Sequence, residues 1–130
     1  MENLICIDTD IIIDHLKGKG PGVEVFAKIV TDATPLTTYI NKFELLCGAR
    51  DKREIQIIED CLCGFTILPF DEQGSHEAAN IYRELKKKGE PIGIRDIMIA
   101  GIAISKHIPL ATKNTREFEK VKKLKIADVH

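Results

Sequence analysis

The residues of this sequence that are best suited to chemistry are carboxylates beside strongly apolar segments. Asp8 closes the apolar run 4–7, Glu44 lies in a largely apolar helical stretch, and Asp96 falls in the first turn of the most apolar segment, 94–106. Carboxylates that converge on one place repel each other, and hard divalent cations relieve the repulsion. We therefore predict a site for Mg²⁺ or Mn²⁺. Such a cation can activate water and offset the charge that develops on a phosphodiester during in-line attack.

A fourth polar region follows the apolar segment 109–112. Asn114 and Glu117 are candidates there, although Asn114 also suits a turn or cap and Glu117 an ordinary first-turn position. Six basic residues between 113 and 125 stand against two acidic ones, namely Lys113, Arg116, Lys120, Lys122, Lys123 and Lys125 against Glu117 and Glu119. This run indicates either a local basic edge or a solvated lysine-rich face.

Each of the first three acids also has a structural alternative. Asp8 suits the N-cap of a helix, a role that Asp10 would fill equally well. Glu44 suits an exposed position on the far face of its helix. Asp96 suits an ion pair with Arg95, since a buried anion needs a partner even at a helix N-terminus.

The elements that must position these acids alternate between short apolar strands and amphipathic helices. The strands are expected at 4–7, 36–38, 65–70, 109–112 and near 126. The helices are expected just after Asp8, at 21–32, up to about Gly48, at 53–62, from Asp71 to Gly89, at 94–106 and from about Thr115. The inward faces are expected to carry Val23, Phe26, Ala27 and Val30 in one helix and Ala78, Ala79, Tyr82 and Leu85 in another. This alternation predicts a three-layer α/β fold with a mostly parallel sheet.

In such a sheet, ligands bind beyond the carboxyl ends of the strands, which is where Asp8 and Asn114 are expected. The 130 residues are 44% hydrophobic and 30% charged, and the net charge is −1. This composition is typical of one globular domain over 1–130 and gives no global field for nucleic acid or membrane. No apolar run approaches a membrane span and the first residues are too acidic for a signal peptide, so we expect a cytoplasmic protein.

Three stretches of the sequence resemble the successive motifs of a known family. The segments ICIDTDIIIDHLKG, TTYINKFELLCGA and IRDIMIAGIAISKHIPLATKNTREFEKV are similar to those of PIN-domain ribonucleases, particularly VapC-type toxins of toxin–antitoxin pairs. The resemblance covers nearly the whole chain. It implies an α/β/α PIN-like fold and cleavage of structured RNA with Mg²⁺ or Mn²⁺, in which water is the nucleophile and a 5′-phosphate and a 3′-hydroxyl are left.

The resemblance also assigns roles to the acids. Asp8, Glu44 and Asp96 match the first, second and third family acids, with Asp8 and Asp96 as metal ligands and Glu44 as a ligand or a partner of the attacking water. Thr9 matches a small hydroxyl residue that hydrogen-bonds within the site. Asp10 departs from the pattern, because the family often has Asn there.

The end of the match leaves a choice open. The stretch 112–118 resembles a T-x-N-x-x-D/E-F ending, which makes Asn114 a polar site residue and Glu117 the fourth acid, while some relatives carry Asp where Asn114 stands. Lys113 and Arg116 are candidates for contacts with RNA backbone phosphates. If the toxin interpretation holds, a VapB-type antitoxin is expected at or near the acidic site, and a homodimer is expected by resemblance.

The same residues also fit three other interpretations. The D-x-D of ICIDTDIII also begins haloacid-dehalogenase-type phosphatases. That family needs a later Lys and a G-D-x-x-x-D-type acidic pair, whereas the late Asp96 here lies in an apolar helix without that pattern. A degenerate PIN domain used only for binding is an alternative, as is a solitary PIN ribonuclease without an antitoxin.

Overall fold

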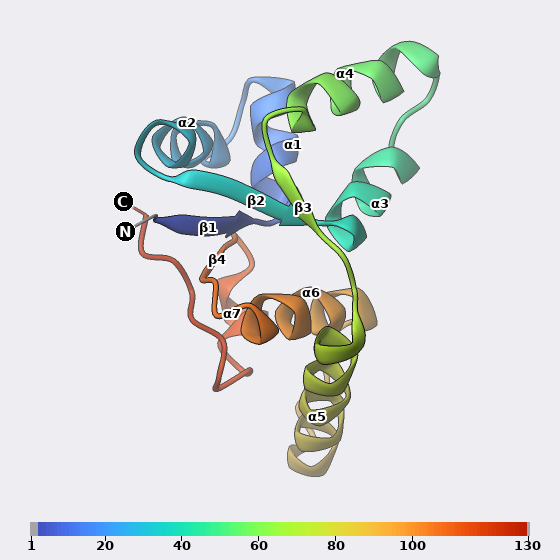
Figure 1. Cartoon of the computed structure of the whole chain (residues 1–130), viewed down its shortest axis with the longest axis vertical. Coiled ribbons are helices and arrows are strands. Elements are labelled where there is room, and N and C mark those ends of the chain that lie inside the picture. The colour runs from blue at the N-terminus through green and yellow to red at the C-terminus, as the bar shows by residue number, and fades with distance from the viewer. Residues whose placement is uncertain (1–2, 130) are drawn as a thin grey trace.

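The computed structural model describes residues 3–129, and its centre is a parallel sheet in the order β3-β2-β1-β4 (Figure 1). The strands are β1 (Leu4–Ile7), β2 (Thr34–Thr38), β3 (Thr66–Leu68) and β4 (Leu110–Ala111). Because parallel neighbours need crossover connections, helices join the strands. These are α1 (Thr9–Lys17), α2 (Gly22–Asp32), α3 (Tyr39–Cys47), α4 (Lys52–Leu62), α5 (Glu72–Lys88), α6 (Ile94–Ser105) and α7 (Thr115–Phe118).

Two cores, one on each face of the sheet, make this a three-layer fold. In β1, Ile5 and Ile7 join a core with α1, α2 and α4, while Cys6 joins the other with α5 and α6. This alternation follows from the period of two along a strand. Figure 1 shows α1, α2 and α4 on one side of the sheet and α5, α6 and α7 on the other. The predicted α/β/α architecture with a parallel sheet is confirmed.

Several expected details were wrong. The strand predicted at 65–70 is only Thr66–Leu68, and the strand near 126 is reduced to a single bridge between Leu110 and Ile126. In α2 the buried positions are Gly22, Phe26 and Ile29, so Ala27 and Val30 face outward. No helix within residues 3–129 has the length and apolar character that a membrane crossing requires.

The face of α5 was predicted only in part, because Ala78 and Leu85 are buried as expected but Ala79 and Tyr82 are not. Its buried residues are Gly74, Ala78, Ile81 and Leu85, whereas Ala79 is exposed and the Tyr82 side chain is 45% exposed. The reason is a close approach to α6. A Cβ added at Gly101 would lie 2.8 Å from the Ala78 Cβ, from the Ala78 backbone N and from the Gly74 carbonyl oxygen. The small residues therefore set the rotation of α5, and this packing holds the helix whose first turn carries Asp96.

Gly101→Ala should lower the free energy of unfolding by about 1 to 3 kcal/mol, because the added methyl group overpacks a contact made partly by backbone atoms. Overpacking should outweigh the gain in helix propensity of about 1 kcal/mol. Urea unfolding measures the change, with Gly64→Ala as the control because a Cβ there meets nothing within 4 Å. A Gly101→Ala protein with the same free energy of unfolding as the parent would show that α5 and α6 can move apart without a cost in stability.

Candidate active site

The site lies at the carboxyl ends of the two central strands. Asp8 directly follows β1, and Thr112 directly follows β4. The chain proceeds from β1 to β2 and β3 on one side and places β4 on the other, so the strand order reverses between β1 and β4. A crevice at such a switch point is where open α/β sheets bind ligands.

Asp8 is buried, with 6% of its surface exposed, and its carboxylate accepts hydrogen bonds from three elements. Its Oδ1 accepts from the Thr9 backbone N–H of α1 and from Asn41 Nδ2 of α3, both at 2.9 Å, and its Oδ2 accepts from Thr112 Oγ1 at 2.7 Å. Asp8, and not Asp10, is the N-cap of α1. The capping role is therefore real, but it uses one of three donors that meet at this side chain.

A chain of hydrogen bonds connects Asp8 to Glu44. Asn41 Nδ2 also donates to Thr9 Oγ1 at 2.9 Å, and Thr9 Oγ1 donates to Glu44 Oε1 at 2.8 Å. Asn41 is fully buried and is held in place by a capping box with Thr38 at the start of α3. Sequence reasoning missed Asn41, although the T-x-x-N spacing after β2 is a signal for such a cap.

Arg95 pairs with Glu44, and not with Asp96 as the sequence alternative had it. The Arg95 Nε lies 3.7 Å from Glu44 Oε2, and Glu44 is half-buried. Asp96, in the first turn of α6, is half-buried. Burial is the largest cause that raises the pKa of Asp96, the charges of Glu44, Glu117 and Asp10 raise it further, and the charge of Arg95 opposes the rise. The four acids predicted for the site, Asp8, Glu44, Asp96 and Glu117, are therefore linked electrostatically through Asp96, and Asp10 joins them.

The loop 112–114 closes the site on the β4 side. Asp10 Oδ2 accepts from the Lys113 backbone N–H at 3.1 Å and from Thr112 Oγ1 at 3.4 Å. The Lys113 Nζ lies 2.8 Å from Asp14 Oδ2, so its charge is already paired. In the part of the chain that the structure describes, Asp10 Oδ1 is buried without a hydrogen-bond partner. Thr112 is a second site contact that the sequence reasoning overlooked.

The remaining predicted residues lie on α7. Asn114 is the exposed N-cap residue of α7, but its side chain makes no capping hydrogen bond. Glu117 pairs with Lys120 at 3.3 Å and contributes to the field at Asp96. Arg116 is exposed. Geometry therefore places Glu117 within electrostatic range of the other acids, while Asn114 reaches the site through its backbone N–H, which donates to Thr112 Oγ1 at 3.0 Å.

The acids nearest the switch point form no ion pair within residues 3–129, although the charges of Lys113 and Arg95 act on Asp10 and Asp96 from farther away. Burial raises the pKa of Asp8 to about 7, Asp10 and Asp96 add to the rise, and the hydrogen bonds from Thr112 and Thr9 oppose it. Among the ion pairs within residues 3–129, Glu44, Asp14 and Glu117 have cations, but Asp8, Asp10 and Asp96 have none. These hard oxygens fit a divalent cation in kind and charge. Within the same residues, no three His, Cys, Asp or Glu side chains are already gathered around one point for a metal.

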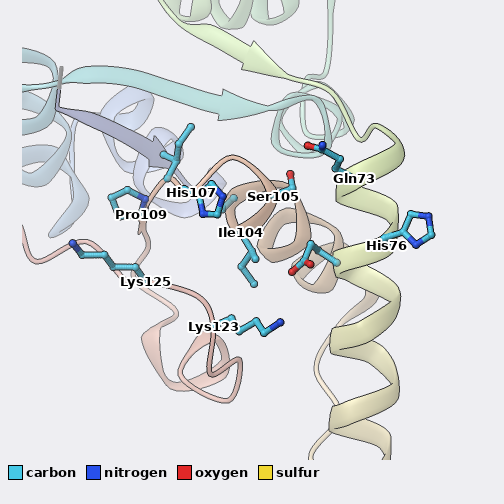
Figure 2. Close-up of a pocket in the computed structure, with 11 residues that line it drawn as sticks. Gln73, His76, Ile104, Ser105, His107, Pro109, Lys123 and Lys125 are labelled. Carbon is cyan, nitrogen blue, oxygen red and sulfur yellow. The ribbon is translucent and has the colours of Figure 1, made fainter. Parts of the chain in front are cut away.

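A separate cavity of 760 Å³ lies away from this acidic site (Figure 2). His107 and Pro109, which precede β4, place it toward the opposite end of that strand. Figure 2 shows the His76 ring pointing away from the cavity. The Nε2 atom of this ring forms a hydrogen bond with Glu72 Oε1 at 2.9 Å. This cavity does not include the carboxylates of the switch point.

Comparison with known proteins decides between the families that the sequence left open. The PIN domain family model matches residues 5–124. The chain belongs to the PIN-domain family. The dehalogenase-type alternative is thereby set aside, and the family predicted from the three motifs is confirmed.

Relatives of this PIN domain are of the VapC type. It is 30% identical over 126 residues to the tRNA(fMet)-specific endonuclease VapC of Salmonella typhimurium, covering 94% of this chain and 95% of that protein. It is 33% identical over 129 residues to Ribonuclease VapC1 of Methanocaldococcus jannaschii, covering 98% and 89%. Among solved structures, DNA-bound VapBC from Salmonella typhimurium matches with a TM-score of 0.85 at 29% identity, covering 100% of both chains.

The raised pKa of Asp8 predicts an unusual stability profile in EDTA. The pKa of this acid is about 4 in the unfolded chain and about 7 in the folded protein. Its ionisation therefore lowers the free energy of unfolding progressively as the pH rises from about 4 to about 7, and the loss is complete above about pH 7. Asp8→Asn should therefore be more stable than the parent at pH 8, by on the order of 2 kcal/mol, with the difference shrinking toward pH 4. Thermal and urea unfolding across pH measure it.

The control for that series is Asp71→Asn. Asp71 is the N-cap of α5, but its pKa is lowered by the Gly74 N–H and by Lys106. Its substitution should therefore destabilise the protein at neutral pH. An Asp8→Asn protein that is less stable than the parent at every pH would mean that the three hydrogen bonds outweigh burial and repulsion.

Proposed function

We propose that this PIN domain is a metal-dependent endoribonuclease of the VapC type that hydrolyses phosphodiester bonds of structured RNA. The observation that supports it best is the group of acids at the switch point, where Asp8 and Asp96 act on each other and neither forms an ion pair with another described residue. Relatives over nearly the whole chain are named ribonucleases. Binding of Mg²⁺ or Mn²⁺ would replace the repulsion between these acids with coordination.

In this proposal Asp8 and Asp96 would hold the cation, and a bound cation would supply activation of water and neutralisation of charge on the phosphate. The side chains of the protein then have separate tasks. Glu44, oriented by Thr9 and Arg95, positions the attacking water and accepts its proton. Asn41 and Thr112 hold the Asp8 carboxylate in one orientation through neutral donors, which leaves its charge available. Glu117 acts as the fourth acid.

RNA is the proposed substrate, and its phosphates are the proposed contacts. Aromatic residues make up only 5% of the sequence, so extensive base stacking is not expected. The exposed Arg116 directly precedes Glu117 on α7 and is the first candidate for a phosphate contact. Since one relative is named a tRNA(fMet)-specific endonuclease, initiator tRNA is the first single RNA to test beside a mixed pool.

A VapB-type antitoxin is the proposed protein partner, because a VapBC complex from Salmonella typhimurium matches this whole chain. We also propose a homodimer and a cytoplasmic location, as the family resemblance implies. A small antitoxin reading frame immediately upstream would favour the toxin role over a solitary ribonuclease. If the parent protein binds neither Mg²⁺ nor Mn²⁺, the result would instead favour a binding module without catalytic activity.

Purified protein should cleave structured RNA with Mg²⁺ or Mn²⁺ and should lose the activity in EDTA. Asp8→Asn and Asp96→Asn should each reduce cleavage by at least about a hundredfold, because both remove a proposed cation ligand. End mapping of the fragments should find 5′-phosphates and 3′-hydroxyls. Asp71→Asn is the matched control, since it removes an acid from a helix N-cap outside the site.

Cleavage that persists in EDTA, or products that end in a cyclic phosphate, would contradict the metal-activated water. Undiminished cleavage by Asp96→Asn would remove that residue from the site.

The fourth position is tested by a separate pair of variants. Glu117→Gln should reduce cleavage more than Asn114→Ala does, because Glu117 contributes charge at Asp96 whereas the Asn114 side chain makes no capping contact. Rates under single-turnover conditions with saturating Mg²⁺ measure the difference. The reverse order would assign the fourth position to Asn114.

A further inference from the structure

One buried acid, Asp14, stands outside the proposed catalytic set but connects to it. Its Oδ2 accepts a hydrogen bond from the Gly22 backbone N–H and lies against the Lys113 Nζ, each at 2.8 Å. A single carboxylate oxygen therefore joins the middle of α1, the start of α2 and the loop 112–114. We name Asp14, Gly22 and Lys113 the Asp14 clamp.

The turn between α1 and α2 is shaped around this carboxylate. A Cβ added at Gly20 would lie 2.6 Å from Asp14 Oδ2, and one added at Gly22 would lie 2.8 Å from the same atom. Gly20 also has a φ of +106°, which favours glycine. The side chain of Asp14 is only 12% exposed, and Lys113 followed by the Gly22 N–H lowers the pKa of Asp14. The clamp therefore holds an ionised carboxylate in a fitted socket.

The other end of the clamp reaches the acidic site through the backbone. The N–H of Lys113 donates to Asp10 Oδ2 at 3.1 Å. The preceding Thr112 donates its hydroxyl hydrogen to Asp8 Oδ2 at 2.7 Å, and the following Asn114 donates its N–H to Thr112 Oγ1. Lys113 thus contacts α1 twice, with its side chain at Asp14 and with its backbone N–H at Asp10, one helical turn away.

We propose that Lys113, held by Asp14, is a positioning residue that fixes the loop 112–114 against Asp8 and Asp10. With its ammonium group in the ion pair, Lys113 does not serve as a phosphate contact. It acts through Thr112, whose hydroxyl orients the Asp8 carboxylate. The kinetic part of the test rests on the proposed ribonuclease function, while the exchange part needs no RNA.

The kinetic test compares three variants with a matched control. Lys113→Met and Asp14→Asn should each lower kcat about tenfold and leave KM within about twofold, because the acids are misplaced while RNA binding is retained. Lys113→Arg should recover most of kcat. The control is Lys88→Met, which breaks an ion pair of similar geometry with Glu84 at 3.0 Å on α5, and it should change neither constant.

A double variant tests whether the two residues act as a unit. Asp14→Asn combined with Lys113→Met should lose about as much kcat as either single change, because the second removes a partner that is already unpaired. Losses that multiply to about a hundredfold would overturn the clamp. A raised KM with a weaker salt dependence for Lys113→Met would also overturn it, since that result is expected of a lost phosphate contact.

Amide hydrogen exchange on the RNA-free protein measures the clamp directly. The amides of Lys113 and Asn114 should exchange about tenfold faster in Lys113→Met and Asp14→Asn than in the parent, and unchanged protection there would refute the proposal. Circular dichroism and thermal unfolding establish that each variant is folded. If the parent cleaves no RNA, the proposed function fails, and the exchange result still decides the clamp.

Discussion

Burial of one carboxylate, that of Asp8, constrains the rest of the site. A buried anion needs hydrogen bonds, and here they come from α1, from α3 and from the residue after β4. These three segments lie far apart in the sequence. They meet because β2, β1 and β4 are neighbouring parallel strands whose carboxyl ends lie together. The hydrogen bonds of Asp8 therefore depend on the topology of the sheet.

The packing of the helices serves the same requirement from the other face. Asp96 must come close to the end of β1 although it lies on α6, which packs on the face of the sheet opposite α1. The approach of α6 to α5 at Gly101 sets where α6 lies. Fold and site are therefore coupled through backbone proximity, which a sequence pattern records only as small residues at helical spacing.

Sequence patterns predicted what depends on local rules. The layer architecture and the positions of β1 and β4 follow from short apolar runs separated by amphipathic helices, and Asp8 at the end of β1 was visible as an exception to the apolar pattern. The partners of the charges were not predictable, because they depend on distances between segments. The structural alternative for Asp96 was an ion pair with Arg95, but Arg95 pairs with Glu44. Tyr82 was expected inside but faces solvent.

The distribution of cations leaves Asp8 without a neighbouring positive charge among the described residues. Arg95, Lys113 and Lys120 pair with Glu44, Asp14 and Glu117, which are the acids at the periphery of the site. Within residues 3–129, Asp8 is held only by neutral donors, and these orient a carboxylate without cancelling its charge. A cation of the protein beside Asp8 would stabilise the fold more but would compete with a divalent ion. The arrangement thus sacrifices some stability at the switch point and keeps negative charge where Mg²⁺ or Mn²⁺ is proposed to bind.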